Sequence, residues 1–218
     1  MDLELRRKWL NQQKELFGNS LYIESKINHD DSNIDLDLST HKIKNCQKCS
    51  LGSSETNFVF GIGNPDADFV FIGEDLGKKE DLTGNPFIGE SGKLLDKIML
   101  AINLTQQNTY ILNVLKCKTY NDIKLKSADV KQYKPYIKEL IQFINPKLII
   151  FLGEIIAQTV LNIKIPLNEI REKSYKYEGI DVLSTYHPAE LLMNPKLKRP
   201  TWEDFKKIKS NYILELTS

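Results

Sequence analysis

The sequence has little cysteine, with three among its 218 residues. Three cysteines are too few for the disulfide framework that holds a small secreted domain together, and we expect an intracellular chain. Two of them, Cys46 and Cys49, stand in C-x-x-C spacing. This spacing places two thiolates on one tight turn and is a common way to hold a metal or a cluster. The third is Cys117.

Long apolar runs are also absent, since none approaches the about 20 residues that cross a bilayer. The first residues, MDLELRRKWLNQQ, lack the apolar region of a secretory signal. We therefore expect a cytoplasmic protein without membrane contact. The sequence contains neither a P-loop nor a G-x-G-x-x-G motif, which argues against a nucleotide-binding signalling domain. With 30 basic and 29 acidic residues, the net charge of +1 neither requires nor excludes a nucleic acid partner.

The composition, 41% hydrophobic and 27% charged, suits one globular domain with some extra length. Residues 2–17 have the pattern of an amphipathic helix, and residues 19–40 show no clear periodicity. We predict an N-terminal helix and loop extension over residues 1–41 and a folded domain over residues 42–218. Three roles stay open for residues 1–40: docking on the domain, binding a protein partner, and dimerisation.

Strand and helix patterns alternate within the predicted domain. Strands are predicted at 68–73, 109–114, 147–152 and 180–186, and helices at 92–99, at 128–144, from 153 onward, and at 202–215. This alternation predicts an α/β fold, a three-layer α/β/α sandwich around a central four-stranded parallel sheet.

Polar residues stand at or just past the carboxyl ends of three predicted strands, namely Glu74, Asn113 and His187. Ligands of open α/β sheets bind beyond the carboxyl ends of the strands, so we expect these three residues in one site. The polar loop after the first strand also carries Phe87. A long loop at this position is usually functional, and a solvated surface loop is the alternative.

The stretch from Asp68 to Met99 resembles the first motif of family 4 uracil-DNA glycosylases. It has a strand, a GE-x-x-G turn, an acidic pair and a G-x-PF-x-G-x-x-G-x-LLD segment. Later segments continue the match: NVLKC at 113–117, PKLIIFLG at 146–153, TYHPAELLMNP at 185–195 and RPTWED at 199–204. The resemblance covers residues 45–212. It implies a DNA repair enzyme that flips uracil out of DNA and hydrolyses its N-glycosidic bond.

The resemblance implies a role for each matching residue. Glu74 and His187 would be catalytic, and Gly73, Phe87 and Asn113 would bind the base. Phe87 would stack on uracil. The Asn113 amide would match uracil O4 and N3–H together, and His187 would donate a hydrogen bond to O2 as charge develops there. The alternatives are a core role for Phe87 and a turn-capping role for Asn113.

Other positions are candidates for water activation and DNA contact. Asp75 departs from the family, which usually has a small residue there, and resembles the water-activating Asp of family 1 enzymes. It is either a gained catalytic carboxylate or a simple replacement. Leu191 and Leu192 are candidate wedges for the gap left by a flipped base, with one of them alternatively in the core. Lys196 and Arg199 are candidate phosphate contacts.

The family also implies a [4Fe–4S] cluster on four cysteines. Cys46, Cys49 and Cys117 match three of these, but the fourth position carries Tyr133. A phenol is a poor substitute for a thiolate on such a cluster. Three outcomes stay open: the chain has no cluster, it holds a labile cluster on three cysteines, or another residue supplies the fourth ligand. Tyr133, Glu55 in place of the family's frequent Arg, and Lys118-Thr119-Tyr120 in place of an R-P-P step favour a second interpretation. In it the chain is a diverged and catalytically weak relative that binds nucleic acid or a protein partner.

Overall fold

The computed structural model describes residues 61–74, 86–105, 107–114 and 127–213. The chain divides into two compact units, Met1–Cys46 and Gln47–Ser218, and all described residues belong to the second. The predicted N-terminal helix, Asp75 and the three cysteines lie outside the described residues. No helix within the described ranges is long and apolar enough to cross a membrane.

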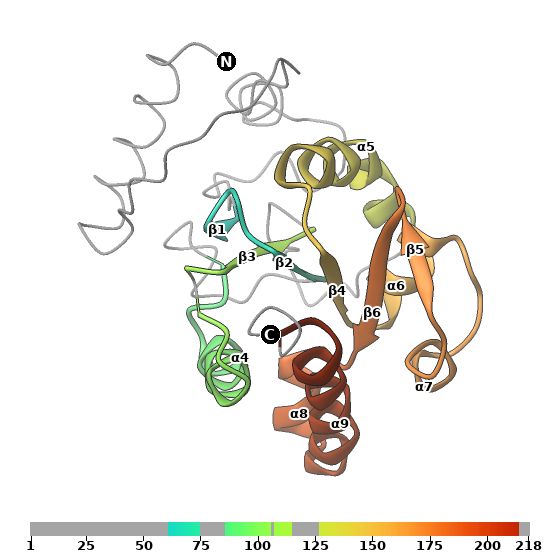
Figure 1. Ribbon diagram of the computed structural model, residues 1–218. Helices are drawn as coiled ribbons and strands as arrows, with labels where there is room; N and C mark the ends of the chain where they lie inside the picture. The colour runs from blue at the N-terminus through green and yellow to red at the C-terminus, as the bar shows by residue number, and fades with distance from the viewer. Residues whose placement is uncertain (1–60, 75–85, 106, 115–126, 214–218) are drawn as a thin grey trace. The chain divides into compact units, whose positions relative to one another are not determined.

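One six-stranded sheet forms the centre of the second unit (Figure 1), in the strand order β1-β3-β2-β4-β6-β5. The four central strands are parallel: β2 (Phe69–Gly73), β3 (Thr109–Asn113), β4 (Leu148–Leu152) and β6 (Ile180–Thr185). The two edge strands are antiparallel: β1 (Ile62–Gly63) and β5 (Tyr175–Tyr177). The predicted α/β fold with four parallel strands is confirmed. The sheet is larger than predicted because the short edge strands add to it.

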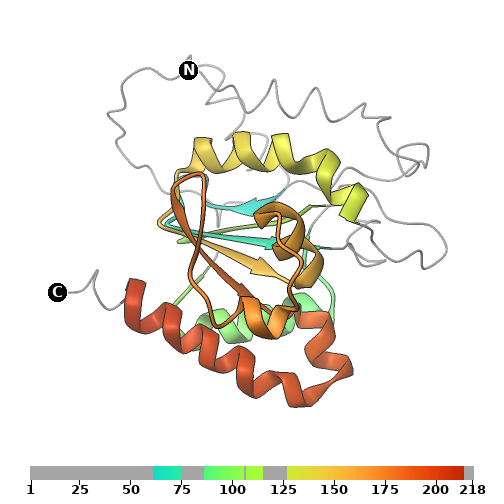
Figure 2. The same ribbon diagram turned by 90° about the vertical axis from the view of Figure 1, so that its right-hand side faces the viewer.

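Helices cover both faces of the sheet, and Figure 2 shows α5 on one side and α4, α8 and α9 on the other. The helices are α4 (Glu90–Ala101), α5 (Ser127–Ile144), α6 (Glu154–Leu161), α7 (Leu167–Ile170), α8 (Pro188–Met193) and α9 (Lys198–Ile208). A 3-10 turn, η3 (Pro195–Leu197), joins α8 to α9, and a π turn, η4 (Lys209–Ile213), follows α9. Helix α9 begins before the predicted residue 202, because Pro200 is tolerated in the first turn of a helix.

Strands β2 and β4 consist only of buried residues, FVFIG and LIIFL. Such continuous apolar runs are typical of parallel strands covered on both faces. On the α4 and α9 side, Phe71 and Phe205 stack with ring centroids 6.1 Å apart inside a larger apolar cluster. This core holds the carboxyl ends of the central strands in fixed positions.

Candidate active site

The four parallel strands end in one row. Gly73 of β2 lies beside Asn113 of β3, and the last residues of β4 and β6 continue the row on the other side of β2. Glu74 follows Gly73 directly, and His187 follows the end of β6 by two residues. All of these residues therefore stand at the carboxyl edge of the sheet, which is where open α/β sheets bind their ligands.

The Phe87 ring contacts the residues at two of these strand ends. Its centroid lies 5.8 Å from that of the His187 ring, at an interplanar angle of 33°. A Cβ atom placed on Gly73 would overlap Asn113 Oδ1 and would lie 2.7 Å from Phe87 Cζ. Glycine at position 73 thus permits the close approach of Phe87 and Asn113, and the structure brings Gly73, Phe87, Asn113 and His187 together.

The backbone of Phe87 adopts a φ of 56°, a left-handed conformation that is rare for a bulky residue. The first turn of α4 packs directly against this backbone. A Cβ atom on Gly92 would overlap the carbonyl of Phe87, so only glycine fits there. Strained backbone of this kind persists where the surrounding structure fixes it, and it is concentrated at functional sites.

Four side-chain polar atoms in the described part of the chain are buried without a hydrogen-bond partner. Two are the hydroxyls of Thr159 and Ser184, and the other two are Asn113 Oδ1 and His187 Nε2. Leaving such a group unpaired costs about 1–3 kcal/mol, and most buried polar groups are therefore paired. Two unpaired atoms beside one aromatic ring indicate a site that pairs them with a ligand.

The geometry around His187 assigns its tautomer. Nδ1 accepts a hydrogen bond from the Ala189 N–H at 3.2 Å, so the neutral ring carries its proton on Nε2. Burial lowers the pKa of His187 to about 4, so the ring is neutral at pH 7. Glu190 completes the turn, because its Oε1 accepts the His187 backbone N–H at 3.3 Å. His187 therefore presents one buried N–H donor.

The side chain of Glu74 reaches from the end of β2 to the start of α6. Its Oε1 accepts the Ile156 N–H at 3.1 Å, and a Cβ atom on Gly153 would overlap the carboxyl group. The pKa of Glu74 is raised to about 7, mainly by burial and to a smaller extent by the Glu190 carboxylate, while the Ile156 hydrogen bond opposes the rise. A carboxyl group that titrates near neutral pH is suited to general base catalysis.

The residues predicted to contact DNA differ in exposure. Leu191 is 1% exposed, so its side chain belongs to the core and is not available at the surface. Leu192 is 47% exposed and Met193 is 87% exposed. Lys196 and Arg199, in the segment that follows α8, are exposed. The surface here combines two apolar side chains with two basic ones.

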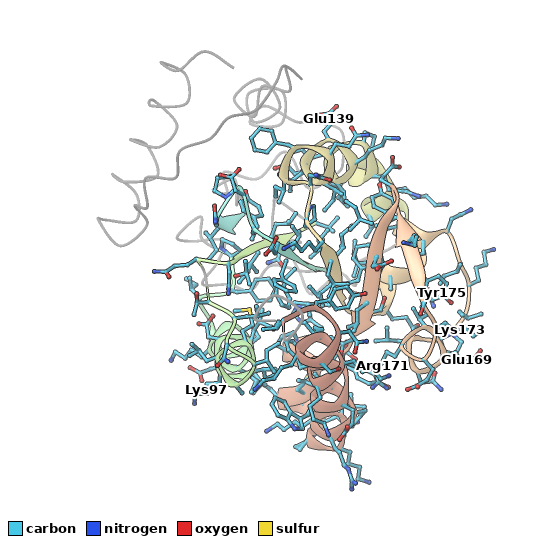
Figure 3. The ribbon with its side chains drawn as sticks, in the orientation of Figure 1. Lys97, Glu139, Glu169, Arg171, Lys173 and Tyr175 are labelled. Atoms are coloured by element: carbon cyan, nitrogen blue, oxygen red, sulfur yellow. The ribbon has the colours of Figure 1, made fainter. Side chains whose placement is uncertain are left out.

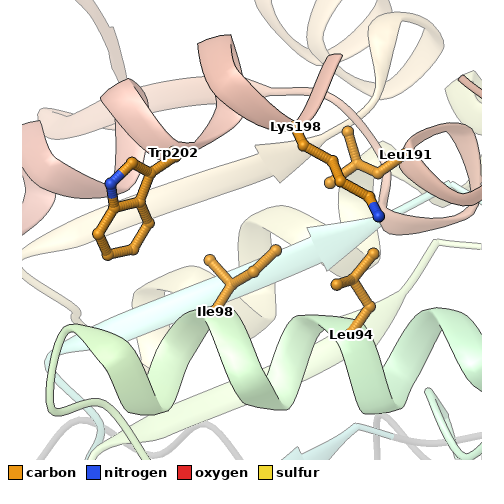
Figure 4. A pocket seen from close by; sticks show the side chains of 5 residues that line it. All are labelled: Leu94, Ile98, Leu191, Lys198 and Trp202. Carbon is orange, nitrogen blue, oxygen red and sulfur yellow. The ribbon is translucent and has the colours of Figure 1, made fainter. Parts of the chain in front are cut away.

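Leu191 also lines a small apolar cavity of about 190 Å³ between α4 and the α8–α9 segment (Figure 4). Its walls are Leu94, Ile98, Leu191, Lys198 and Trp202. The cavity contains none of the polar groups found at the strand ends. The inward direction of Leu191 is therefore explained by packing between helices.

Two residues that the sequence reasoning missed contribute to this region, Glu190 and Met193. Glu190 stands three residues after His187, which is the spacing of a capping box. The motif is usually recognised by Ser or Thr at the N-cap, and here His187 occupies that position. Met193 ends α8, and its outward direction depends on where that helix begins. Tyr133 is 6% exposed within α5, while Asp75, Cys46, Cys49 and Cys117 lie outside the described residues.

Comparison with known proteins gives consistent matches. The profile of the Uracil DNA glycosylase superfamily matches residues 60–206. The type-4 uracil-DNA glycosylase of Archaeoglobus fulgidus is 36% identical over 181 residues, covering 79% of this chain and 91% of the relative. The type-4 enzyme of Saccharolobus solfataricus is 36% identical, covering 80% and 85% of the two chains. That of Sulfurisphaera tokodaii is 38% identical, covering 78% and 84%.

Proposed function

Because the chain belongs to the type-4 uracil-DNA glycosylase family, we propose that it hydrolyses the N-glycosidic bond of uracil in DNA by base flipping. The main support is the pair of buried, unpartnered atoms beside the Phe87 ring, Asn113 Oδ1 and His187 Nε2. One is a hydrogen-bond acceptor and the other a donor. A flipped uracil offers a partner to each of them.

Asn113 would distinguish uracil from cytosine. Its Oδ1 accepts the N3–H of uracil, and its amide N–H donates to O4. Cytosine presents the opposite pattern, an acceptor at N3 and a donor at N4, so it would leave both groups of the buried amide unpaired. Phe87 stacks on the flipped base, and the absence of a side chain at Gly73 leaves room for the ring.

His187 and Glu74 act on the glycosidic bond. When this bond breaks, its electron pair leaves with N1 of uracil, and the charge spreads to O2. The neutral His187 ring donates its Nε2–H to that oxygen. The Glu74 carboxylate stabilises the sugar cation and orients water, whose oxygen adds to C1′ while its proton passes to the carboxylate or the base. Asp75 follows Glu74 in sequence and is the candidate for a second carboxylate.

DNA contact is assigned to the end of α8 and the segment after it. Leu192 and Met193 are exposed apolar side chains suited to fill the gap left by a flipped base. Lys196 and Arg199 would hold phosphates. Leu191, with 1% exposure, packs behind them.

The donor set of this chain does not fit the [4Fe–4S] cluster that the family implies. Four thiolates are needed, and the whole sequence has three cysteines. The fourth position carries Tyr133, which is buried within α5. We assign no catalytic step to a cluster. The same substitution supports a second candidate function, a diverged relative that binds DNA or a protein without rapid excision.

Incubation with a uracil-containing oligonucleotide, followed by alkali cleavage of abasic sites, tests the proposal. A matched thymine oligonucleotide serves as the control. His187→Ala and Asn113→Ala should each lower turnover by about 10²–10³-fold, the loss seen when one transition-state donor is removed. Binding to uracil-free DNA should barely change, because phosphate contacts carry it. DNA binding without excision by the wild type would favour the second candidate.

A further inference from the structure

A buried ion pair links α9 to the segment after α7. Arg171 donates from Nε to Asp204 Oδ2 at 2.7 Å and from Nη2 to Asp204 Oδ1 at 2.9 Å. Nη2 also donates to the Pro200 carbonyl at 2.7 Å. The two side chains are 7% and 1% exposed, and Figure 3 shows Arg171 between α7 and α9. This is a forked, fully enclosed pair, the strong form of such contacts.

The pair also contacts the two residues that precede His187. The Thr185 hydroxyl donates to Asp204 Oδ2 at 2.6 Å. The Arg171 guanidinium lies 5.0 Å from the centre of the Tyr186 ring. Asp204 and Arg171 therefore hold the chain at the point where it leaves β6 and enters the His187 turn.

The backbone of Thr185 is fixed from the other side as well. Its carbonyl accepts the Gly153 N–H at 2.8 Å, at the end of β4. After the turn, the hydrogen bonds of Ala189 and Glu190 to His187 fix the start of α8. Specific contacts thus hold the chain on both sides of His187, at Thr185 and Tyr186 before it and at Ala189 and Glu190 after it.

Stability alone does not account for this arrangement. Burying two charges costs about as much as their attraction returns, so a buried pair is weak support for stability, and in some proteins such a pair serves to fix one geometry. Here the geometry that it fixes is the approach to the only histidine in the described part of the chain. Lys207 Nζ also lies near the pair, 4.0 Å from Asp204 Oδ1.

We propose that the Arg171–Asp204 pair, acting through the Thr185 hydroxyl and the Tyr186 ring, is a positioning element that directs His187 Nε2 toward the base pocket. Its catalytic consequence rests on the proposed function, in which His187 donates to the leaving uracil. Its structural consequence, one fixed orientation and tautomer of the imidazole, does not depend on that function.

Two Thr→Val substitutions separate positioning from general loss of structure. Thr185→Val removes the hydroxyl that joins Asp204 to the strand end and leaves the ion pair in place. Thr201→Val is the matched control, since Thr201 is 1% exposed, lies in α9 beside the pair, and donates only to the Leu197 carbonyl. Asp204→Asn removes the charge at nearly constant size.

Nitrogen-15 NMR of the full chain with His29→Gln and His41→Gln leaves His187 as the sole histidine. The parent should show one ring signal set with the proton on Nε2. Thr185→Val and Asp204→Asn should add a second signal set or the other tautomer, while Thr201→Val should not. An unchanged His187 spectrum in folded Thr185→Val overturns the proposal, whatever the outcome with Asp204→Asn.

Uracil excision under single-turnover conditions provides the second measurement. Thr185→Val should slow the chemical step by about 10–100-fold, because small misplacement of a reacting group is costly, and should leave KM nearly unchanged. In a His187→Ala background the same substitution should cause no further loss. Equal losses in both backgrounds would overturn the catalytic link. A wild type without excision would refute the proposed function, and the NMR result would still decide the positioning role.

Discussion

Replacing Glu74 by glutamine should stabilise the folded protein at alkaline pH while impairing excision. Burial raises the Glu74 pKa from its ordinary value of 4.5 to about 7. At about 1.4 kcal/mol per pKa unit, this corresponds to about 3 kcal/mol of free energy. The fold therefore prefers the protonated carboxyl group, and ionising it in the native state costs this amount.

The sign of the pH dependence follows from linkage. Since the pKa of Glu74 is higher in the folded state than in the unfolded state, the native state binds the proton more tightly. The stability that this proton contributes is fully present below pH 4.5. The free energy of unfolding of the wild type should fall by about 3 kcal/mol as the pH rises from about 4.5 past 7. Glutamine does not titrate, and its Oε1 still accepts the Ile156 N–H. The variant should lose this pH dependence.

Urea unfolding of both proteins between about pH 4.5 and about pH 8.5 measures the difference. The stability of Glu74→Gln relative to the wild type should grow with pH and level off above about pH 7. Glu169→Gln removes an exposed carboxylate and should give a curve parallel to the wild type. Parallel curves for Glu74→Gln as well would refute the burial argument. Excision should fall in Glu74→Gln at every pH, since the carboxylate proposed to act on the sugar is gone.

Three further predictions concern the pocket, the cluster position and the DNA surface. Gly73→Ala should cost about 1–3 kcal/mol in urea unfolding and weaken uracil binding, because its Cβ overlaps Asn113 Oδ1; unchanged affinity would exclude a base beside Gly73. Tyr133→Cys, purified without oxygen, should be brown and contain about four irons per chain, because it restores the fourth thiolate ligand. A wild type with the same iron content would show that the cluster does not need a fourth cysteine. Met193→Ala should slow excision from duplex DNA more than from single strands, since only the duplex leaves a gap to fill; equal slowing would argue against a wedge.

The sequence patterns predicted the central sheet well because its strands are buried on both faces. The run KLIIFL at 147–152 gives β4 almost to the residue. The edge strands gave no usable signal: β1 has two residues, and β5 reads Tyr-Lys-Tyr with one exposed side chain between two half-buried ones. Pairing with a neighbouring strand creates these elements, and pairing is not visible in local periodicity.

The site residues also differ in how well the sequence alone predicts them. Asn113 follows from the position of a strand end, which a single sequence reveals. The sequence prediction took Leu191 and Leu192 as the wedge candidates and missed Met193, because three apolar residues stand in succession and the inward one depends on the helix start. The Arg171–Asp204 pair joins residues 33 positions apart, and neither residue has a local pattern that names its partner. Contacts of this range come from the fold.

Burial shifts the pKa values of Glu74 and His187 in opposite directions, and these shifts bear on the chemistry proposed for the site. It raises the carboxyl pKa to about 7 and lowers the imidazole pKa to about 4, so both groups are pushed toward their neutral forms. Glu74 then titrates near neutral pH, while the imidazole keeps a single proton on Nε2. A protonated, cationic His187 would offer donors on both nitrogens and lose the Ala189 N–H as a partner of Nδ1. These protonation states support the proposed division of roles, in which a neutral imidazole donates to the departing base and a carboxylate acts on the sugar, whereas acid catalysis by an imidazolium would not need that division.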